Sequence, residues 1–249
     1  MSGTPALAVA GVCRSFGGLR AVDQVDLTLG QGERRGIIGP NGAGKTTLFN
    51  LIAGEVAPTA GGIALFGRDV TRLPPQRRAA LGLARTFQVN TLFPNLTVTE
   101  NLLLAVQGTM PTKLRIHRPL SSYRELHEQA RSLLGSLGLE GAGETMARAL
   151  SHGEQRQLEV ALALASHPRV LLLDEPTAGL SLAESQRLTS LLKRLDRSMS
   201  LLVIEHDMDV VFDLAERITV LHEGKVIAEG DRSEVRANAL VKDIYLGTG

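Results

Sequence analysis

The sequence lacks several features that would assign it to common classes of protein. It has no tryptophan, two tyrosines and six phenylalanines, so its core must rest on leucine, valine, isoleucine and alanine. Cys13 is the only cysteine, which excludes an intrachain disulfide and fits a reducing compartment. The formal net charge of +1 gives no electrostatic reason to expect nucleic acid or anionic lipid as the main partner.

Long hydrophobic runs are also absent. No apolar run approaches the roughly 18–20 residues that a membrane-spanning helix needs, and residues 170–173 are strongly apolar but only of strand length. The first ten residues lack the basic segment and the unbroken apolar segment of a signal peptide. We therefore expect a chain that does not cross a membrane, so that in a transport system other chains would form the pore.

The order of apolar segments predicts an α/β protein. Strand candidates at residues 7–16, 25–29 and 35–38 precede a helix at 45–53 that stops at Gly54. After residue 166 strands and helices alternate, which predicts a mainly parallel sheet covered on both faces. We expect strands at 170–173, 201–204, 218–221 and 225–228, and helices at 182–195 and 208–215.

The middle of the chain, from about residue 91 to 165, reads mainly as helix. Two capping boxes open helices there, one formed by Thr97 and Glu100 and the other by Ser151 and Glu154. We expect one domain over 1–249, with a core lobe at about 1–90 and 166–249 and an inserted helical lobe at about 91–165.

The strongest local motif is a glycine-rich loop between a predicted strand and a predicted helix. It fits the pattern G-x-x-x-x-G-K-[ST] with Gly39, Pro40, Asn41, Gly42, Ala43, Gly44, Lys45 and Thr46. Glycines let backbone N–H groups approach phosphate oxygens, and the following helix directs its positive end at them. Lys45 would meet the terminal phosphates and Thr46 would bind Mg²⁺, and we include Thr47 in the nucleotide-binding set. A plain glycine-rich turn is disfavoured, but the loop alone does not separate ATPases, GTPases and kinases.

Polar side chains follow two later strands, where ligands gather in open α/β sheets. Asp174 would hold Mg²⁺, and Glu175 would orient and deprotonate an attacking water. The alternative is a solvated acidic strand end. His206 follows the strand at 201–204 and could hydrogen-bond the γ-phosphate, although a lone histidine is as often structural.

Taken together and in order, these motifs resemble the nucleotide-binding domain of ABC transporters over residues 7–230. Gln88 in Arg-Thr-Phe-Gln matches the Q-loop glutamine, which in that family contacts Mg²⁺ and the attacking water near the docked membrane subunits. Residues 150–154, LSHGE, match the signature motif, and 178–181, AGLS, fall at the D-loop. Phe16 falls where an aromatic ring stacks on adenine, with a core phenylalanine as the alternative. The resemblance implies a P-loop NTPase core with an N-terminal antiparallel part and an inserted helical subdomain, and ATP and Mg²⁺ as cofactors.

The resemblance also implies that two ATPase subunits work as a pair. Signature residues Ser151 and Gly153 contact the γ-phosphate held by another subunit, and this chain has one copy of each motif, so we expect a second ATPase, itself or a homologue. His152 and Glu154 replace the commoner glycine and glutamine of the signature, and AGLS departs from the commoner SALD, which leaves the communication between subunits open.

Several motifs, among them RTFQ, LSHGE and the Glu-His-Asp-Met at 205–208, are together similar to those of the branched-chain amino acid importer ATPases. That similarity implies two membrane permease subunits, a periplasmic or extracellular solute-binding protein, no nucleic acid, and a peripheral location at the cytoplasmic face of the cell membrane. Importers of urea or short amides are the alternative in the same group. Two alternatives lie outside the importer group. One is a soluble non-transport ABC ATPase, which is disfavoured because this domain is short and has no basic stripe. The other is a regulatory module that binds ATP without hydrolysing it.

Overall fold

The structure is a computed structural model, and it describes residues 3–86, 92–109 and 124–246. The described residues form two compact units. Unit 1 comprises those within Met1–Arg85, Arg169–Pro176 and Leu195–Gly249, and unit 2 those within Thr86–Pro168 and Thr177–Arg194. Residues 177–194, which we expected in the core lobe, therefore group with unit 2, and the assignment of both lobes to one domain stays a prediction.

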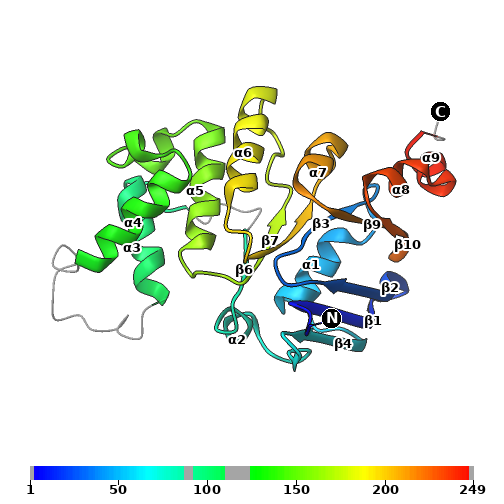
Figure 1. Ribbon diagram of the computed structural model, residues 1–249. Helices are drawn as coiled ribbons and strands as arrows, with labels where there is room; N and C mark the ends of the chain where they lie inside the picture. The colour runs from blue at the N-terminus through cyan, green and yellow to red at the C-terminus, as the bar shows by residue number, and fades with distance from the viewer. Residues whose placement is uncertain (1–2, 87–91, 110–123, 247–249) are drawn as a thin grey trace. The chain divides into compact units, whose positions relative to one another are not determined.

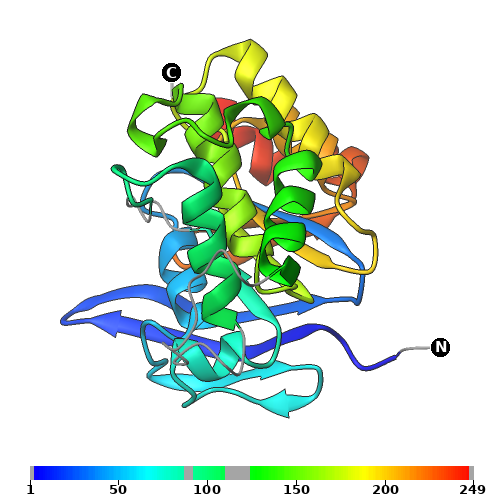
Figure 2. The same ribbon diagram turned by 90° about the vertical axis from the view of Figure 1, so that its left-hand side faces the viewer.

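Unit 1 contains an antiparallel sheet of four strands in the order β2-β1-β4-β5. Figure 2 shows it in blue to cyan. Its strands are β1 (Leu7–Phe16), β2 (Leu19–Leu29), β4 (Ala60–Leu65) and β5 (Arg68–Asp69). Strand β2 begins six residues before the predicted start at 25, because register shifts between β1 and β2 break the alternation that marks a strand in the sequence.

The second sheet of unit 1 has six strands in the order β10-β9-β3-β8-β7-β6. Only β10 runs antiparallel to its neighbour, which confirms the predicted mainly parallel sheet. Its strands are β3 (Arg34–Ile38), β6 (Leu83–Arg85), β7 (Val170–Asp174), β8 (Ser200–Ile204), β9 (Arg217–His222) and β10 (Lys225–Gly230).

Helix α1 (Lys45–Ala53) lies between the two sheets (Figure 1). Its buried Leu48 and Ile52 belong to one apolar cluster with Leu29 of the antiparallel sheet and Leu172 of the parallel sheet. A second cluster lies between the parallel sheet and α7 (Met208–Leu214), α8 (Arg232–Ala237) and α9 (Ala239–Leu246). The parallel sheet is thus covered on both faces, as buried parallel strands require. A short helix, α2 (Pro75–Ala79), precedes β6.

Unit 2 is helical, and Figures 1 and 2 show α3, α4 and α5 side by side. Its elements are α3 (Val98–Thr109), α4 (Arg124–Ser136), the 3₁₀ turns η2 (Glu140–Ala142) and η3 (Ala147–Ala149), α5 (His152–Leu164) and α6 (Leu182–Arg194). Both predicted capping boxes are confirmed: Thr97 and Ser151 each exchange hydrogen bonds with the glutamate three residues later. None of the helices in the described part of the chain combines the length and apolar character of a membrane span.

Candidate active site

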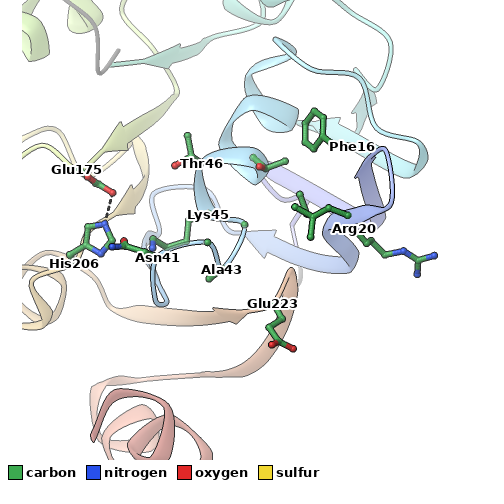
Figure 3. Close-up of a pocket in the computed structure, with 14 residues that line it drawn as sticks. Phe16, Arg20, Asn41, Ala43, Lys45, Thr46, Glu175, His206 and Glu223 are labelled. Carbon is green, nitrogen blue, oxygen red and sulfur yellow. Dashed lines mark hydrogen bonds and ion pairs between the residues drawn. The ribbon is translucent and has the colours of Figure 1, made fainter. Parts of the chain in front are cut away.

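A cleft of about 640 Å³ opens in unit 1 around the glycine-rich loop, a volume typical of small-molecule sites (Figure 3). It is lined by Phe16, Leu19, Arg20, Ala21, Asn41, Gly42, Ala43, Gly44, Lys45, Thr46, Thr47, Glu175, His206 and Glu223. Segments far apart in sequence therefore meet here, and they include most of the residues predicted for the site. Three predicted residues, Asp174, Gly39 and Pro40, do not line the cleft. They adjoin it in the sequence, because Glu175 and Asn41 do line it.

The backbone of the loop explains its glycines. Gly44 has a φ of 100°, and a Cβ atom there would lie 2.3 Å from the carbonyl oxygen of Ala21, so no other residue fits. Gly42 also has a positive φ, of 80°, but nothing lies within 4 Å of its Cβ position, which leaves the loop accessible from that side. Helix α1 begins at Lys45 without a side-chain cap, so its first N–H groups can bind an anion.

The Lys45 side chain spans the loop. The residue is 5% exposed, and its Nζ donates hydrogen bonds to the carbonyl oxygens of Gly39 at 2.7 Å and Pro40 at 3.1 Å. Burial lowers the pKa of the ammonium, while the negative charges of Glu175 and Asp174 raise it in part. The lysine thus holds a buried positive charge at the start of α1, within electrostatic reach of the two carboxylates.

Asp174 ends strand β7 and is almost fully buried, at 2% exposure. Its Oδ2 accepts a hydrogen bond of 2.6 Å from Nη2 of Arg85, at the end of the neighbouring strand β6. Burial raises the pKa of Asp174, and the charged hydrogen bond from Arg85 opposes that rise. Arg85 could not be predicted as a partner of Asp174, because the two residues are 89 positions apart in the sequence.

Glu175 leaves the strand in a different direction. Its φ is 48°, a left-handed conformation that is uncommon for residues other than glycine and that four other non-glycine residues of the described chain share. Its Oε1 lies 2.5 Å from Nε2 of His206, the one hydrogen bond drawn in Figure 3. The structure therefore joins the predicted base and the predicted histidine directly, and a hydrogen bond from His206 to the γ-phosphate stays a prediction.

Phe16 lies at the end of β1, and its exposure of 46% excludes the alternative of a core phenylalanine. The guanidinium carbon of Arg14 lies 4.6 Å from the ring centroid. Stacking of the ring on an adenine stays a prediction. Gln88, the predicted Q-loop glutamine, lies outside the described residues.

The signature residues lie in unit 2 at the start of α5. Ser151 is the exposed N-cap of the helix, and its Oγ accepts a hydrogen bond from the Glu154 amide. The Gly153 amide donates to Oε1 of Glu184 at 3.2 Å, and a Cβ atom on Gly153 would lie 2.8 Å from that oxygen. Sequence reasoning missed Glu184, although the Ser181 to Glu184 spacing is a further capping box that could have drawn attention to it.

Comparison with known proteins decides the family. The profile of the ABC transporter family matches residues 22–178, a stretch that includes the loop, the signature and both carboxylates. The chain belongs to the ABC transporter family. Among curated ABC relatives, it is 40% identical over 98% of both chains to the high-affinity branched-chain amino acid transport ATP-binding protein LivG of Salmonella typhimurium.

Solved ABC structures share the fold. The ADP conformation of MJ1267, an ATP-binding cassette of an ABC transporter, matches with a TM-score of 0.86 and 30% identity over 98% of this chain and 99% of that one. The dimeric post-hydrolysis state of the cassette MJ0796, bound to ADP and Pi, matches with a TM-score of 0.75 and 27% identity over 90% and 98%. These matches confirm the predicted P-loop fold class, and the nucleotide-binding function of the family agrees with the cleft.

Proposed function

We propose that this chain is the ATP-hydrolysing subunit of an ABC importer for branched-chain amino acids. The observation that carries this proposal is the 40% identity to LivG, which extends over 98% of both chains. An ATPase subunit does not touch the solute, so no single motif identifies the cargo. Likeness along the whole chain therefore supports the proposal better than any single motif does.

The geometry of the cleft supports a role in ATP hydrolysis for four of the residues that line it. The first N–H groups of α1 and the charge of Lys45 would bind the phosphates, and the exposed ring of Phe16 would stack on adenine. Glu175 would accept the proton of a water whose oxygen attacks the γ-phosphorus as the bond to ADP breaks. His206, bonded to Glu175, would keep that carboxylate in place, which matters because hydrolysis of this kind is mostly a problem of positioning.

The donor set in unit 1 fits Mg²⁺. The Thr46 hydroxyl and the Asp174 carboxylate are oxygen ligands, and no group of three or more His, Cys, Asp or Glu side chains suited to a metal occurs among the described residues. Magnesium is usually held by one or two carboxylates plus substrate phosphates, so a nucleotide would complete its coordination here. The bound ion would neutralise phosphate charge. We include Gln88 among the candidate ligands.

The assembly that we propose contains two ATPases, two permease subunits and a solute-binding protein, with this chain at the cytoplasmic face of the membrane. The Gly153 amide donates to Glu184 within this chain, so the start of α5 offers an anion the helix dipole and the exposed hydroxyl of Ser151. In the assembly that anion would be the γ-phosphate bound to the second ATPase. The dimer of MJ0796 bound to ADP and Pi supports pairing of this kind.

Uptake by cells tests the proposal. In a strain that lacks this gene, uptake of radiolabelled leucine should fall, and the intact chain should restore it, as should a control with Arg77→Met at an exposed position. Lys45→Ala should not restore it. Loss of urea or acetamide uptake instead would assign the alternative cargo and overturn the proposed one. Recovery of the tagged chain with ribosomes rather than with permeases would exclude a transport role.

A further inference from the structure

Arg85 connects three separate parts of unit 1. Its side chain is 8% exposed, and its Nη2 donates to Oδ2 of Asp174 at 2.6 Å. Its Nη1 donates to Oδ1 of Asn50 at 2.6 Å and lies 3.1 Å from Oε2 of Glu55. One guanidinium therefore ties the end of β7 to helix α1 and to the residue that follows the C-cap of that helix.

The contact with Asn50 has a geometric consequence. Asn50 and Thr46 are four residues apart on α1, so their side chains lie on the same face of the helix. Thr46 and Asp174 are the two described oxygen donors for the proposed magnesium ion. Arg85 donates a hydrogen bond to Asp174 directly, and it donates another to Asn50, the neighbour of Thr46 on the helix. The distance between Thr46 and Asp174 therefore depends on the guanidinium of Arg85.

Geometry assigns Asp174 to Arg85 rather than to the nearby lysine. The Asp174 carboxylate is almost fully buried, and Arg85 donates a hydrogen bond to its Oδ2 from the neighbouring strand. Lys45 donates instead to the carbonyl oxygens of Gly39 and Pro40. A planar guanidinium can hold Asp174 with one nitrogen and Asn50 with another, which the single ammonium of a lysine cannot reproduce in the same geometry.

We propose that Arg85 is the positioning residue of the magnesium site, and that it sets the orientation of Asp174 relative to Thr46 through its bonds to Asp174 and Asn50. The inference rests on the proposed function, because it assumes that Mg²⁺ binds these two residues with the nucleotide. Arg85 itself carries a positive charge, so it would orient the ligands rather than bind the metal. Groups that orient metal ligands typically change metal affinity by about 10–100-fold when they are removed.

Fluorescent mant-ATP provides the test. Binding is first titrated in EDTA, and Mg²⁺ is then added in steps at a fixed nucleotide concentration. Arg85→Gln should bind mant-ATP in EDTA within about twofold of the natural chain, but its half-saturating Mg²⁺ concentration should rise about tenfold or more. Arg85→Lys, which keeps the charge but not the fork, should fall between the two and serves as the measured variant should Arg85→Gln not fold.

Arg78→Gln is the matched control. Arg78 is a buried arginine that donates hydrogen bonds to backbone carbonyls at the other end of α1 and at residues 71 and 73, so its loss should lower the melting temperature and leave the Mg²⁺ titration unchanged. An Mg²⁺ titration of Arg85→Gln equal to that of the natural chain would overturn the inference. So would a parallel loss of binding with and without Mg²⁺, which a purely structural role predicts. If the natural chain itself shows no Mg²⁺ dependence, the proposed metal site fails rather than the role of Arg85 alone.

Discussion

Replacing Arg78 by methionine should destabilise the fold strongly while leaving the chemistry of the cleft in place. The side chain of Arg78 is buried, and its guanidinium donates to four backbone carbonyls. These belong to Leu51 and Ile52 at 2.7 Å each, Leu73 at 2.9 Å and Thr71 at 3.1 Å. The first two lie in the last turn of α1, where a helix leaves carbonyl groups unsatisfied and favours a positive charge.

The magnitude follows from these contacts. Hydrogen bonds from a charged donor contribute about 1.5–3 kcal/mol each, but burial lowers the pKa of Arg78, a sign that the charge is itself costly to bury. Methionine fills the volume of the aliphatic stem and leaves the carbonyls without the guanidinium. Each buried carbonyl left without its donor costs about 1–3 kcal/mol, and relief from burying the charge offsets part of that sum, so we expect a net loss of about 3–5 kcal/mol. For a chain of this size that corresponds to a fall of roughly 6–20 °C in Tm.

Scanning calorimetry of Arg78→Met against Arg77→Met measures the effect. Arg77 is the exposed neighbour in the same helix, and its substitution should change the free energy of unfolding by less than about 0.5 kcal/mol. Equal melting temperatures for the two variants would refute the argument that Arg78 holds the end of α1. A fall in Tm accompanied by complete loss of nucleotide binding at 10 °C would show that the helix depends on Arg78 for its native position.

Two further variants address binding and turnover. Lys45→Ala should weaken ATP binding by at least tenfold in calorimetry, because the phosphates lose the charge that the loop carbonyls hold in place; unchanged affinity would contradict the proposed role of the loop. Ser151→Asp should keep the helix cap and the melting temperature, since aspartate also caps helices, yet abolish turnover by repelling the γ-phosphate of the second subunit. Normal turnover in Ser151→Asp would exclude the proposed contact between subunits.

The parts of the fold that local sequence determines were predictable. The phosphate loop needs Gly44 at its positive φ, and α1 runs over the predicted residues. Both capping boxes of unit 2 depend on residues three positions apart, so their hydrogen bonds could be expected from spacing alone.

Other features depend on contacts between distant segments. Residues 60–85 contribute β4, β5, α2 and β6, yet these elements are short and show no clear period in the sequence. The bonds from Arg85 to Asp174 and from Gly153 to Glu184 join positions that only the folded chain brings together. The cleft residues Leu19 and Glu223 were missed for the same reason, because neither carries a motif.

The central claim is that the cleft hydrolyses ATP with Glu175 as the base, and the variant Glu175→Gln tests it most directly. The amide keeps the size of the side chain and can still contact His206, but it cannot accept the proton of the attacking water. In the presence of Mg²⁺ and ATP, we predict that this variant binds ATP, releases no phosphate above background, and elutes as a pair of ATPase subunits in size-exclusion chromatography. Phosphate release at the rate of the natural chain would contradict the account.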